Sequence, residues 1–267
     1  MMSRTLSGKV VSEIGLGTWG IGGRSTPDPA NDLQDIAAIR YALQMGISVI
    51  DTAEMYAAGH TEEVVARAIS GFEREKLFII SKVWHNHLRH DDLIRAAKES
   101  LKRLGTRYLD LYLIHWPNPS VPIKESIGAM EELLSLGLVR NIGVSNFSVG
   151  QLQEAMDSAR SSRISANQIE YSYGRREPER DIIPFCEKNK VDVIAYTPIA
   201  KGKLSSFAGI RKVAAKYGST QVQIALRYVM ERSFPIPKSS NKEHIAELIG
   251  ATKINLAEDD YKELSLA

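Results

Sequence analysis

Residues 78–117 read FIISKVWHNHLRHDDLIRAAKESLKRLGTRYLDLYLIHWP, and they contain two strand patterns separated by one helical pattern. Residues 78–80 and 109–114 are nearly continuous apolar runs, which are typical of strands buried on both faces in a parallel sheet. Over residues 92–104 the apolar side chains instead recur at helical spacing. Two parallel strands joined by a helix form the βαβ unit, so this stretch predicts an α/β fold.

The same unit repeats on both sides of this stretch. Further apolar runs occupy residues 14–16, 48–50, 141–144, 166–169, 191–195 and 234–236. Further helical patterns occupy residues 32–45, 62–69, 125–136, 149–159, 180–189, 221–231 and 242–249. Eight strands, each followed by a helix, match the count of a closed (β/α)8 barrel, or TIM barrel. A doubly wound open sheet is the alternative fold.

The two ends of the chain add small elements to this pattern. Residues 4–6 and 9–11, on either side of Ser7-Gly8, predict a short β-hairpin that would lie at the bottom of a barrel. The residues after Asp260 form only a short C-terminal helix or tail. Because no low-complexity linker divides the chain, we expect residues 1–267 to form a single barrel domain.

The composition restricts the partners and the compartment. The chain carries 34 Lys and Arg against 32 Asp and Glu, and this near-balance gives no reason to expect nucleic acid or a membrane surface as a partner. No apolar run approaches the roughly 18 residues of a membrane span or resembles a signal peptide. The only cysteine is Cys186, which excludes an intrachain disulfide and favours a reducing compartment, the cytoplasm.

Polar and ionisable residues follow several of the predicted strands. In both candidate folds the chemistry takes place outside the carboxyl ends of the strands. Asp51, Lys82 and His115 stand at three of these ends, and Tyr56 lies in the loop after Asp51. Each has an ordinary structural explanation by itself, as a helix cap, a loop aromatic, a solvated strand end or a core histidine. Their joint placement at one mouth favours a functional site.

These four residues can together protonate an oxygen atom. A tyrosine phenol has an ordinary pKa of about 10, and a nearby ammonium lowers it. We therefore expect Lys82, held in place by Asp51, to lower the pKa of Tyr56, and His115 to donate to or orient a substrate oxygen. This set suits hydride transfer to a carbonyl group, in which a cofactor supplies the hydride and the protein supplies the proton.

Five motifs of the sequence resemble the aldo-keto reductase superfamily. They are Asp51-Thr-Ala-Glu-Met-Tyr56, Ser81-Lys82-Val-Trp84, Ile114-His115-Trp116-Pro117, Gly143-Val-Ser145-Asn146-Phe147 and Ile236-Pro237-Lys238-Ser239. The similarity covers nearly the whole chain, whose compact form is similar to prokaryotic members. The resemblance implies a TIM barrel that binds a nicotinamide cofactor in extended form across its mouth. It implies Tyr56 as general acid/base, Asp51 and Lys82 as the residues that tune it, and His115 as the residue that orients the carbonyl.

The resemblance also assigns contacts to each part of the cofactor and to the substrate. Thr18 and Trp19 match cofactor contacts, Ser145, Asn146 and Gln168 match positions that hold the nicotinamide carboxamide, and Tyr196 matches the aromatic residue that stacks on the nicotinamide ring. Thr197, Ile199, Lys201 and Gly202 match the segment along the pyrophosphate, and Lys238, Ser239, Ser240 and His244 match the segment around the adenosine 2′-phosphate. Trp19, Trp84 and Trp116 match aromatic residues of the substrate pocket.

The sequence departs from the family pattern in two places. Six residues after Lys238 the family commonly has an arginine that binds the 2′-phosphate, whereas this chain has His244, a weaker partner for an anion. Lys238, Lys242 or the amides at the start of the last barrel helix are other candidates for phosphate binding, so we expect NADP, with NAD as the alternative. The chain also lacks the long C-terminal loop that many members fold over the substrate, which predicts an open pocket and a broad substrate range.

Some of the motifs also fit other interpretations. Residues 15–20, GLGTWG, fit the dinucleotide-binding GxGxxG pattern, but they run into a Gly- and Pro-rich loop rather than a helix, so we assign them to the first loop of the barrel. His85, His87 and His90, with Asp51 and His115, leave a metal-dependent barrel hydrolase as a runner-up, although we expect no metal. A cofactor-binding sensor or regulatory subunit with little turnover is the other alternative. We expect a small carbonyl or alcohol as substrate and favour a monomer.

Overall fold

The computed structural model describes residues 3–202, 204 and 206–266, and this part of the chain is built from the following elements. The strands are β1 Ser3–Leu6, β2 Lys9–Ser12, β3 Leu16–Gly17, β4 Val49–Asp51, β5 Phe78–Val83, β6 Leu111–Ile114, β7 Ile142–Ser145, β8 Ile164–Glu170, β9 Asp192–Tyr196 and β10 Phe234–Pro235. The helices are α1 Asp32–Gln44, α2 His60–Ile69, α3 His90–Leu104, α4 Ile123–Ser135, α5 Val149–Ser158, α6 Ile182–Asn189, α7 Ala208–Lys216, α8 Gln221–Met230, α9 Lys242–Gly250 and α10 Glu258–Leu266.

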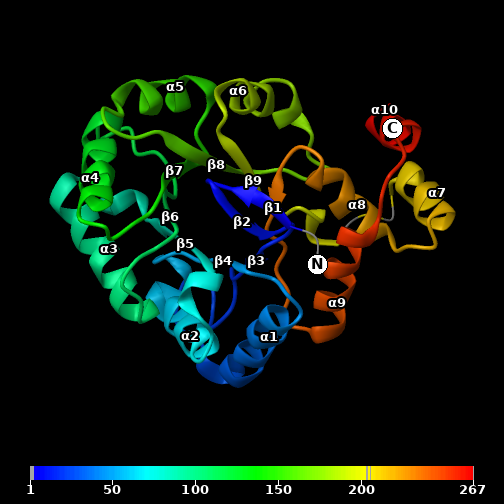
Figure 1. Cartoon of the computed structure of the whole chain (residues 1–267), viewed down its shortest axis with the longest axis horizontal. Coiled ribbons are helices and arrows are strands. Elements are labelled where there is room, and N and C mark those ends of the chain that lie inside the picture. The colour runs from blue at the N-terminus through cyan, green and yellow to red at the C-terminus, as the bar shows by residue number, and fades with distance from the viewer. Residues whose placement is uncertain (1–2, 203, 205, 267) are drawn as a thin grey trace.

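Strands β3 to β10 form one parallel sheet in which each strand pairs with the next one along the chain. The first and last of these strands also meet, because the Gly15 amide donates to the Pro235 carbonyl at 3.0 Å and the Gly17 amide donates to the Pro237 carbonyl at 2.9 Å. These bonds close the sheet into a (β/α)8 barrel with its helices on the outside (Figure 1). The predicted barrel is confirmed, and the alternative of an open doubly wound sheet is wrong.

The interior of the barrel is filled by every second residue of the strands. Strand side chains alternate between two faces, so one face of each strand points to the barrel axis and the other to the helices. The inner face contributes one apolar cluster and the outer face contributes another, which packs against the helices. The inner cluster consists of Leu6, Val11, Val49, Phe78, Ile80, Leu111, Leu113, Ala166, Ile194, Phe234 and Ile236.

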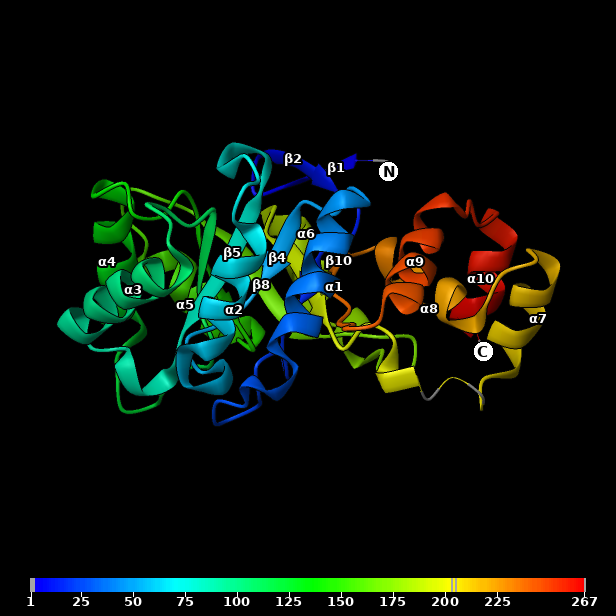
Figure 2. The same ribbon diagram turned by 90° about the horizontal axis from the view of Figure 1, so that it is seen from below.

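The predicted N-terminal hairpin is present as β1 and β2. Its two-residue turn has positive φ at Ser7 (46°) and Gly8 (82°), the conformation that matches the twist of a tight hairpin. The Ser7 amide donates to the Asp192 carboxylate at 2.6 Å, and the Lys9 ammonium donates to the Asp110 carboxylate at 2.9 Å. Because these acids stand where β9 and β6 begin, the hairpin covers the amino end of the barrel (Figure 2).

Helices α7 and α10 lie to one side of the barrel, beyond α8 and α9 (Figures 1 and 2). The Lys216 ammonium and the Tyr217 hydroxyl both donate to the Asp260 carboxylate, each at 2.6 Å, which joins the two helices. Helix α10 corresponds to the expected short C-terminal helix, whereas α7 was not expected from the sequence. None of the described helices is long and apolar enough to span a bilayer.

Candidate active site

The polar residues of the barrel mouth lie on the same inward-facing side of the strands as the inner apolar cluster. In each of five strands, a polar residue near the carboxyl end follows an inner apolar residue by two positions. Because side chains on a strand alternate between its two faces, this polar side chain also points toward the barrel axis. These pairs are Val49 and Asp51, Ile80 and Lys82, Leu113 and His115, Ala166 and Gln168, and Ile194 and Tyr196. The barrel therefore brings five strands' polar ends together in one layer above the core.

Lys82 is the centre of this layer. Its ammonium donates to the Asp51 carboxylate at 2.7 Å, to the Thr52 carbonyl at 2.8 Å and to the Tyr56 hydroxyl at 3.3 Å. The Lys82 and Asp51 side chains are 0% and 2% exposed, so water does not screen their interaction. Burial alone would lower the pKa of Lys82, but the facing Asp51 and Tyr56 outweigh it and raise the pKa, which keeps the ammonium charged.

A sharp turn directs Tyr56 toward Lys82. The turn is a short 3-10 segment, Tyr56–Gly59, that leads into α2. Ala57 and Ala58 have positive φ (49° and 51°), a conformation that side chains rarely adopt and that recurs at functional sites. The Tyr56 side chain is buried as a result, and its ring lies edge-on to that of Trp19 at 5.0 Å.

The net effect of the surroundings on Tyr56 is opposite to the one expected from the sequence. Burial raises the pKa of Tyr56, the charge of Lys82 lowers it, and the charge of Asp51 raises it, with a net increase. The contribution of Lys82 has the predicted sign, but the predicted lowering of the pKa is wrong because the sequence does not reveal how deeply the phenol is buried. A raised pKa keeps the hydroxyl protonated at neutral pH, as a proton donor must be.

His115 lies on the other side of the tyrosine. Its ring centroid is 5.6 Å from that of Tyr56 and 5.1 Å from that of Trp84. Burial and the nearby Lys82 lower the pKa of His115 to about 2, so the imidazole is neutral. Its Nδ1 atom is buried and has no hydrogen-bond partner among the described residues. A neutral imidazole in this position can donate one hydrogen bond to a substrate oxygen.

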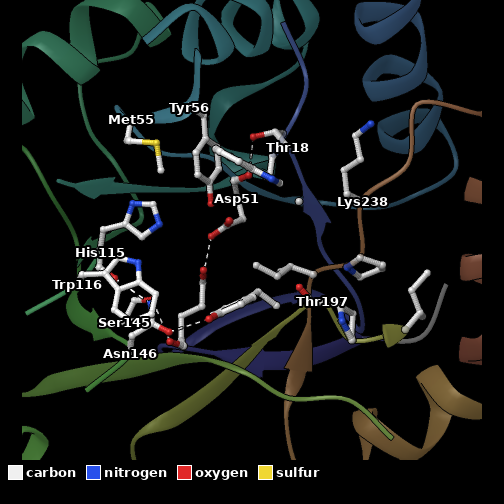
Figure 3. A pocket seen from close by; sticks show the side chains of 18 residues that line it. Thr18, Asp51, Met55, Tyr56, His115, Trp116, Ser145, Asn146, Thr197 and Lys238 are labelled. Carbon is white, nitrogen blue, oxygen red and sulfur yellow. Dashed lines mark hydrogen bonds between the residues drawn. The ribbon is translucent and has the colours of Figure 1, made fainter. Parts of the chain in front are cut away.

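A cavity of about 420 Å³ opens above these residues (Figure 3). Thirteen of the site residues expected from the sequence line it: Thr18, Trp19, Asp51, Tyr56, His115, Trp116, Ser145, Asn146, Gln168, Tyr196, Thr197, Ile199 and Lys238. Five further lining residues were not expected: Gly17, Met55, Pro198, Ile236 and Pro237. Each of them lies within two positions of an expected residue in the sequence, and this position could have identified them in advance.

The amide and hydroxyl groups on one wall of the cavity bind one another. Asn146 donates to the His115 carbonyl and to the Ser145 hydroxyl, each at 3.0 Å, and accepts from the Tyr196 hydroxyl at 2.9 Å. Gln168 donates to Asp51 at 2.7 Å, a bond that the sequence analysis did not predict. Gln168, one of the three residues expected to hold a carboxamide, therefore also positions the carboxylate of the Asp51–Lys82 pair.

The remaining expected residues are not among the described residues that line the cavity. Trp84 instead lies edge-on to the ring of His115. The Ser239 hydroxyl bonds to the backbone of Asn241, and the Ser240 hydroxyl accepts from Lys238 at 2.9 Å. His244 is exposed on α9. Gly202 is also exposed, and the side chain of Lys201 lies outside the described part of the chain.

The histidines that suggested a metal site have other partners. His87 bonds to Glu54 at 3.0 Å, and His90 bonds to Asp91 at 2.9 Å and to Glu132 at 3.1 Å. Among the described residues, no three His, Cys, Asp or Glu side chains are grouped in a way that could hold a metal ion.

A family model described as "Aldo/keto reductase family" matches residues 13–266. The chain belongs to the aldo-keto reductase family. This aldo-keto reductase is 34% identical to the methylglyoxal reductase YeaE of Escherichia coli K12 over 261 residues, which are 95% of this chain and 90% of the relative.

Solved aldo-keto reductases share the fold closely. The structure of the thermostable aldo-keto reductase Tm1743 in complex with the inhibitor epalrestat has a TM-score of 0.96 and 44% identity, with 100% of both chains covered. The aldo-keto reductase from Klebsiella pneumoniae in complex with NADPH has a TM-score of 0.91 and 35% identity, with 100% of this chain and 95% of that chain covered.

Proposed function

We propose that this protein reduces aldehydes or ketones to alcohols with NADPH, and that Tyr56 supplies the proton. One observation supports this most directly: the Lys82 ammonium contacts both the Asp51 carboxylate and the Tyr56 hydroxyl at the floor of the cavity. The names of the similar proteins agree with it, since they include methylglyoxal reductases and an NADPH complex.

The residues divide the chemistry among them. Bound NADPH supplies a hydride to the carbonyl carbon. Tyr56 holds a proton at its hydroxyl and delivers it to the carbonyl oxygen as negative charge develops there. The Lys82 ammonium stabilises the phenolate that remains, and the buried Asp51 keeps this ammonium in place. His115, which is neutral, donates a hydrogen bond that orients the carbonyl oxygen.

The hydrogen-bond donors and the positive charge that line the cavity fit a nicotinamide cofactor. Ser145, Asn146 and Gln168 present hydroxyl and amide groups of the kind that recognise a carboxamide, and the flat ring of Tyr196 lies beside them. Lys238 lines the opposite side of the cavity and offers a positive charge for a phosphate (Figure 3). We propose that these residues hold the cofactor, with Thr18, Trp19, Thr197 and Ile199 as further contacts, and that Trp19 and Trp116 contact the substrate.

Replacing Tyr56 by Phe tests the proposed role of the phenol. The substitution removes only the hydroxyl, so we expect kcat for aldehyde reduction to fall by about 10²–10⁴-fold, the usual contribution of a general acid. The Kd for NADPH, measured from cofactor fluorescence, should stay within a factor of about two, because no cofactor contact is assigned to the hydroxyl. Tyr108→Phe, which removes a phenol at the other end of the barrel, is the matched control and should leave both quantities unchanged.

The same experiment separates the enzyme from the alternative of a sensor subunit. Equal turnover by Tyr56→Phe and the unaltered protein would remove Tyr56 from the mechanism. Tight NADPH binding by the unaltered protein with no turnover of any aldehyde in a broad panel would instead favour the sensor.

We also propose that residues 1–267 act as one domain, as a monomer, in the cytoplasm. All the side chains of the proposed site come from one chain, so no second copy is needed to complete it. The only cysteine, Cys186, is buried, and burial raises the pKa of its thiol to about 12, which suits a packing role in a reducing compartment.

A further inference from the structure

The chain between β4 and Tyr56 stays paired with β5. The Thr52 amide donates to the Ile80 carbonyl at 2.9 Å. Two residues further on, the Glu54 amide donates to the Lys82 carbonyl at 3.3 Å. These bonds continue the parallel ladder of β4 and β5 as far as Glu54, which lies only two residues before the proposed proton donor.

The side chain of Glu54 supplies the next acceptor of this ladder. In evenly spaced parallel pairing, the Trp84 amide would donate to the backbone carbonyl of Glu54. It donates instead to the Glu54 carboxylate, at 2.5 Å. Because the carboxylate takes the place of a main-chain acceptor, the backbone can leave the sheet at this point and form the sharp turn that carries Tyr56.

The same carboxylate holds the loop that follows β5. Its Oε1 atom also bonds to the Nδ1 atom of His87 at 3.0 Å, and the His87 amide donates to the Trp84 carbonyl at 2.9 Å. From the loop after β6, the Asn118 side chain donates to the His85 carbonyl at 2.9 Å. The Glu54 side chain is only 11% exposed, so water competes little for these bonds. The loop of residues 84–87 is therefore held from two sides.

This loop places the indole of Trp84 against His115. The two rings lie edge-on, with their centroids 5.1 Å apart. The Nδ1 atom of His115 has no hydrogen-bond partner among the described residues, so packing against neighbouring rings orients the imidazole. The other ring in contact with it is that of Tyr56 at 5.6 Å, on the same wall of the cavity (Figure 3).

We propose that Glu54 is a positioning residue for the reduction. By holding the Trp84 amide it fixes the indole against His115, and so fixes the imidazole that orients the carbonyl oxygen. The side chain of Glu54 thus joins the turn that carries the proton donor to the loop that supports the second hydrogen-bond donor. This inference rests on the proposed function.

Replacing Glu54 by Ala or by Gln separates loss of the acceptor from loss of the charge. Glu54→Ala removes the acceptor, and we expect kcat/KM for aldehyde reduction to fall by about tenfold to 10²-fold, the cost of a small misplacement near the reacting atoms. Glu54→Gln keeps an oxygen that can accept from the Trp84 amide, so its kcat/KM should stay within about threefold of the unaltered protein.

Binding of the cofactor should not change in either variant. Neither Glu54 nor Trp84 is among the described residues that line the cavity. The Kd for NADPH should therefore stay within a factor of about two, a change of well under 1.4 kcal/mol. A general loss of structure would instead weaken NADPH binding together with turnover.

A double-mutant cycle with His115→Gln tests whether the effect passes through the imidazole. Residues that act as a unit are not additive. Once His115 is Gln, Glu54→Ala should therefore lower kcat/KM by less than about threefold. A tenfold or larger loss in that background contradicts the proposal, because an effect that does not depend on His115 lowers activity equally in both backgrounds.

Glu132→Ala is the matched control. It also removes a carboxylate that bonds to a histidine, since Glu132 lies 3.1 Å from the Nε2 atom of His90. Glu132 is on α4, in the outer layer of helices, and the variant should leave kcat/KM and the Kd for NADPH unchanged (Figure 1).

Unchanged kcat/KM in a correctly folded Glu54→Ala protein overturns this inference alone, and so does a Glu54→Gln protein as slow as Glu54→Ala. No aldehyde reduction by the unaltered protein overturns the proposed function itself, so the two failures can be told apart. Circular dichroism and thermal melting show whether each variant is folded. If Glu54→Ala is not folded, Glu54→Asp, whose side chain is one methylene too short to reach the Trp84 amide, takes its place in the same cycle with the same expected loss.

Discussion

His115 illustrates how burial fixes the protonation of one residue. The side chain is 7% exposed, and burial with the charge of Lys82 lowers its pKa to about 2. The folded protein therefore carries a neutral imidazole across the whole range in which a solvated histidine would titrate. A hydrogen-bond donor at this position does not switch off as the pH changes between 5 and 8.

This depressed pKa predicts a pH dependence of stability. Between pH 2 and pH 6.5 the unfolded chain binds a proton at position 115 and the folded chain does not, so the free energy of unfolding falls as the pH falls below about 6.5. The contribution approaches about 1.4 kcal/mol per pH unit. In His115→Gln, the free energy of unfolding measured in urea should depend less steeply on pH between pH 6 and pH 4. The slope should be smaller than in the unaltered protein by up to this amount.

The control for this prediction is His244→Gln, which removes an exposed histidine and should leave the slope as it is. Identical slopes for His115→Gln and the unaltered protein would mean that His115 is not held neutral in the fold.

Site residues could be predicted from the sequence where they extend the alternation of inward- and outward-facing side chains along a strand. Asp51, Lys82 and His115 each follow an inner apolar residue by two positions, so a strand assignment already directs them inward. The net pKa of Tyr56 was not readable in this way, because its sign depends on burial produced by other segments of the chain. The Gln168–Asp51 bond was missed for the same reason, since the two residues are far apart in sequence and meet only across the barrel.

At the scale of elements, a buried ion pair joins α2 to α3 behind the Tyr56 turn. The Arg103 guanidinium donates to the Glu62 carboxylate at 2.7 Å, and the Ser81 hydroxyl of β5 donates to the same carboxylate at 2.6 Å. The Glu62 side chain is 0% exposed and that of Arg103 is 23% exposed. A Cβ on Gly59, the last residue of the turn, would lie 2.8 Å from the Arg103 side chain, so the pair also supports the turn.

Breaking this pair from one side should destabilise the protein strongly. Arg103→Met leaves a buried carboxylate without its cation, and we expect the free energy of unfolding to fall by about 3 kcal/mol in urea titrations at pH 7. Adding Glu62→Gln should recover part of the loss. The exposed pair Lys76–Glu73 is the control, since Lys76→Met should change the stability by less than about 1 kcal/mol. A loss as small as the control's in Arg103→Met would contradict this account.

The sequence predicted the helices and strands that belong to the repeated strand–helix unit of the barrel. It did not predict one helix outside that repeat. All eight barrel strands and their helices were located, because long apolar runs and helical periodicity alternate regularly. Helix α7 was not predicted. It has only nine residues, of which Ile210, Val213 and Ala214 are buried, so its apolar stripe is too short to stand out from a loop.

At the scale of the whole molecule, closure of the barrel depends on a close approach of β3 to β10. A Cβ on Gly17 would lie 2.7 Å from the Ile236 carbonyl oxygen, a backbone atom that cannot move away without disturbing the strand. Gly17→Ala should therefore lower the free energy of unfolding by about 1–3 kcal/mol, the usual cost of overpacking, as measured by urea unfolding.

The matched control is Gly128→Ala in α4, where a Cβ would meet nothing within 4 Å. Alanine is the better helix former, so this variant should be stabilised by about 0.5–1 kcal/mol. A Gly17→Ala protein as stable as the unaltered one would show that the seam between β3 and β10 is looser than the structure indicates.

Because the hairpin packs Leu6 and Val11 into the inner apolar cluster at the amino end of the barrel, the cavity lies at the opposite, carboxyl end. At that end Trp19 and Trp116 line the cavity, and each is 43% exposed. Molecules that enter or leave the cavity at this end therefore meet two indole rings that solvent already reaches.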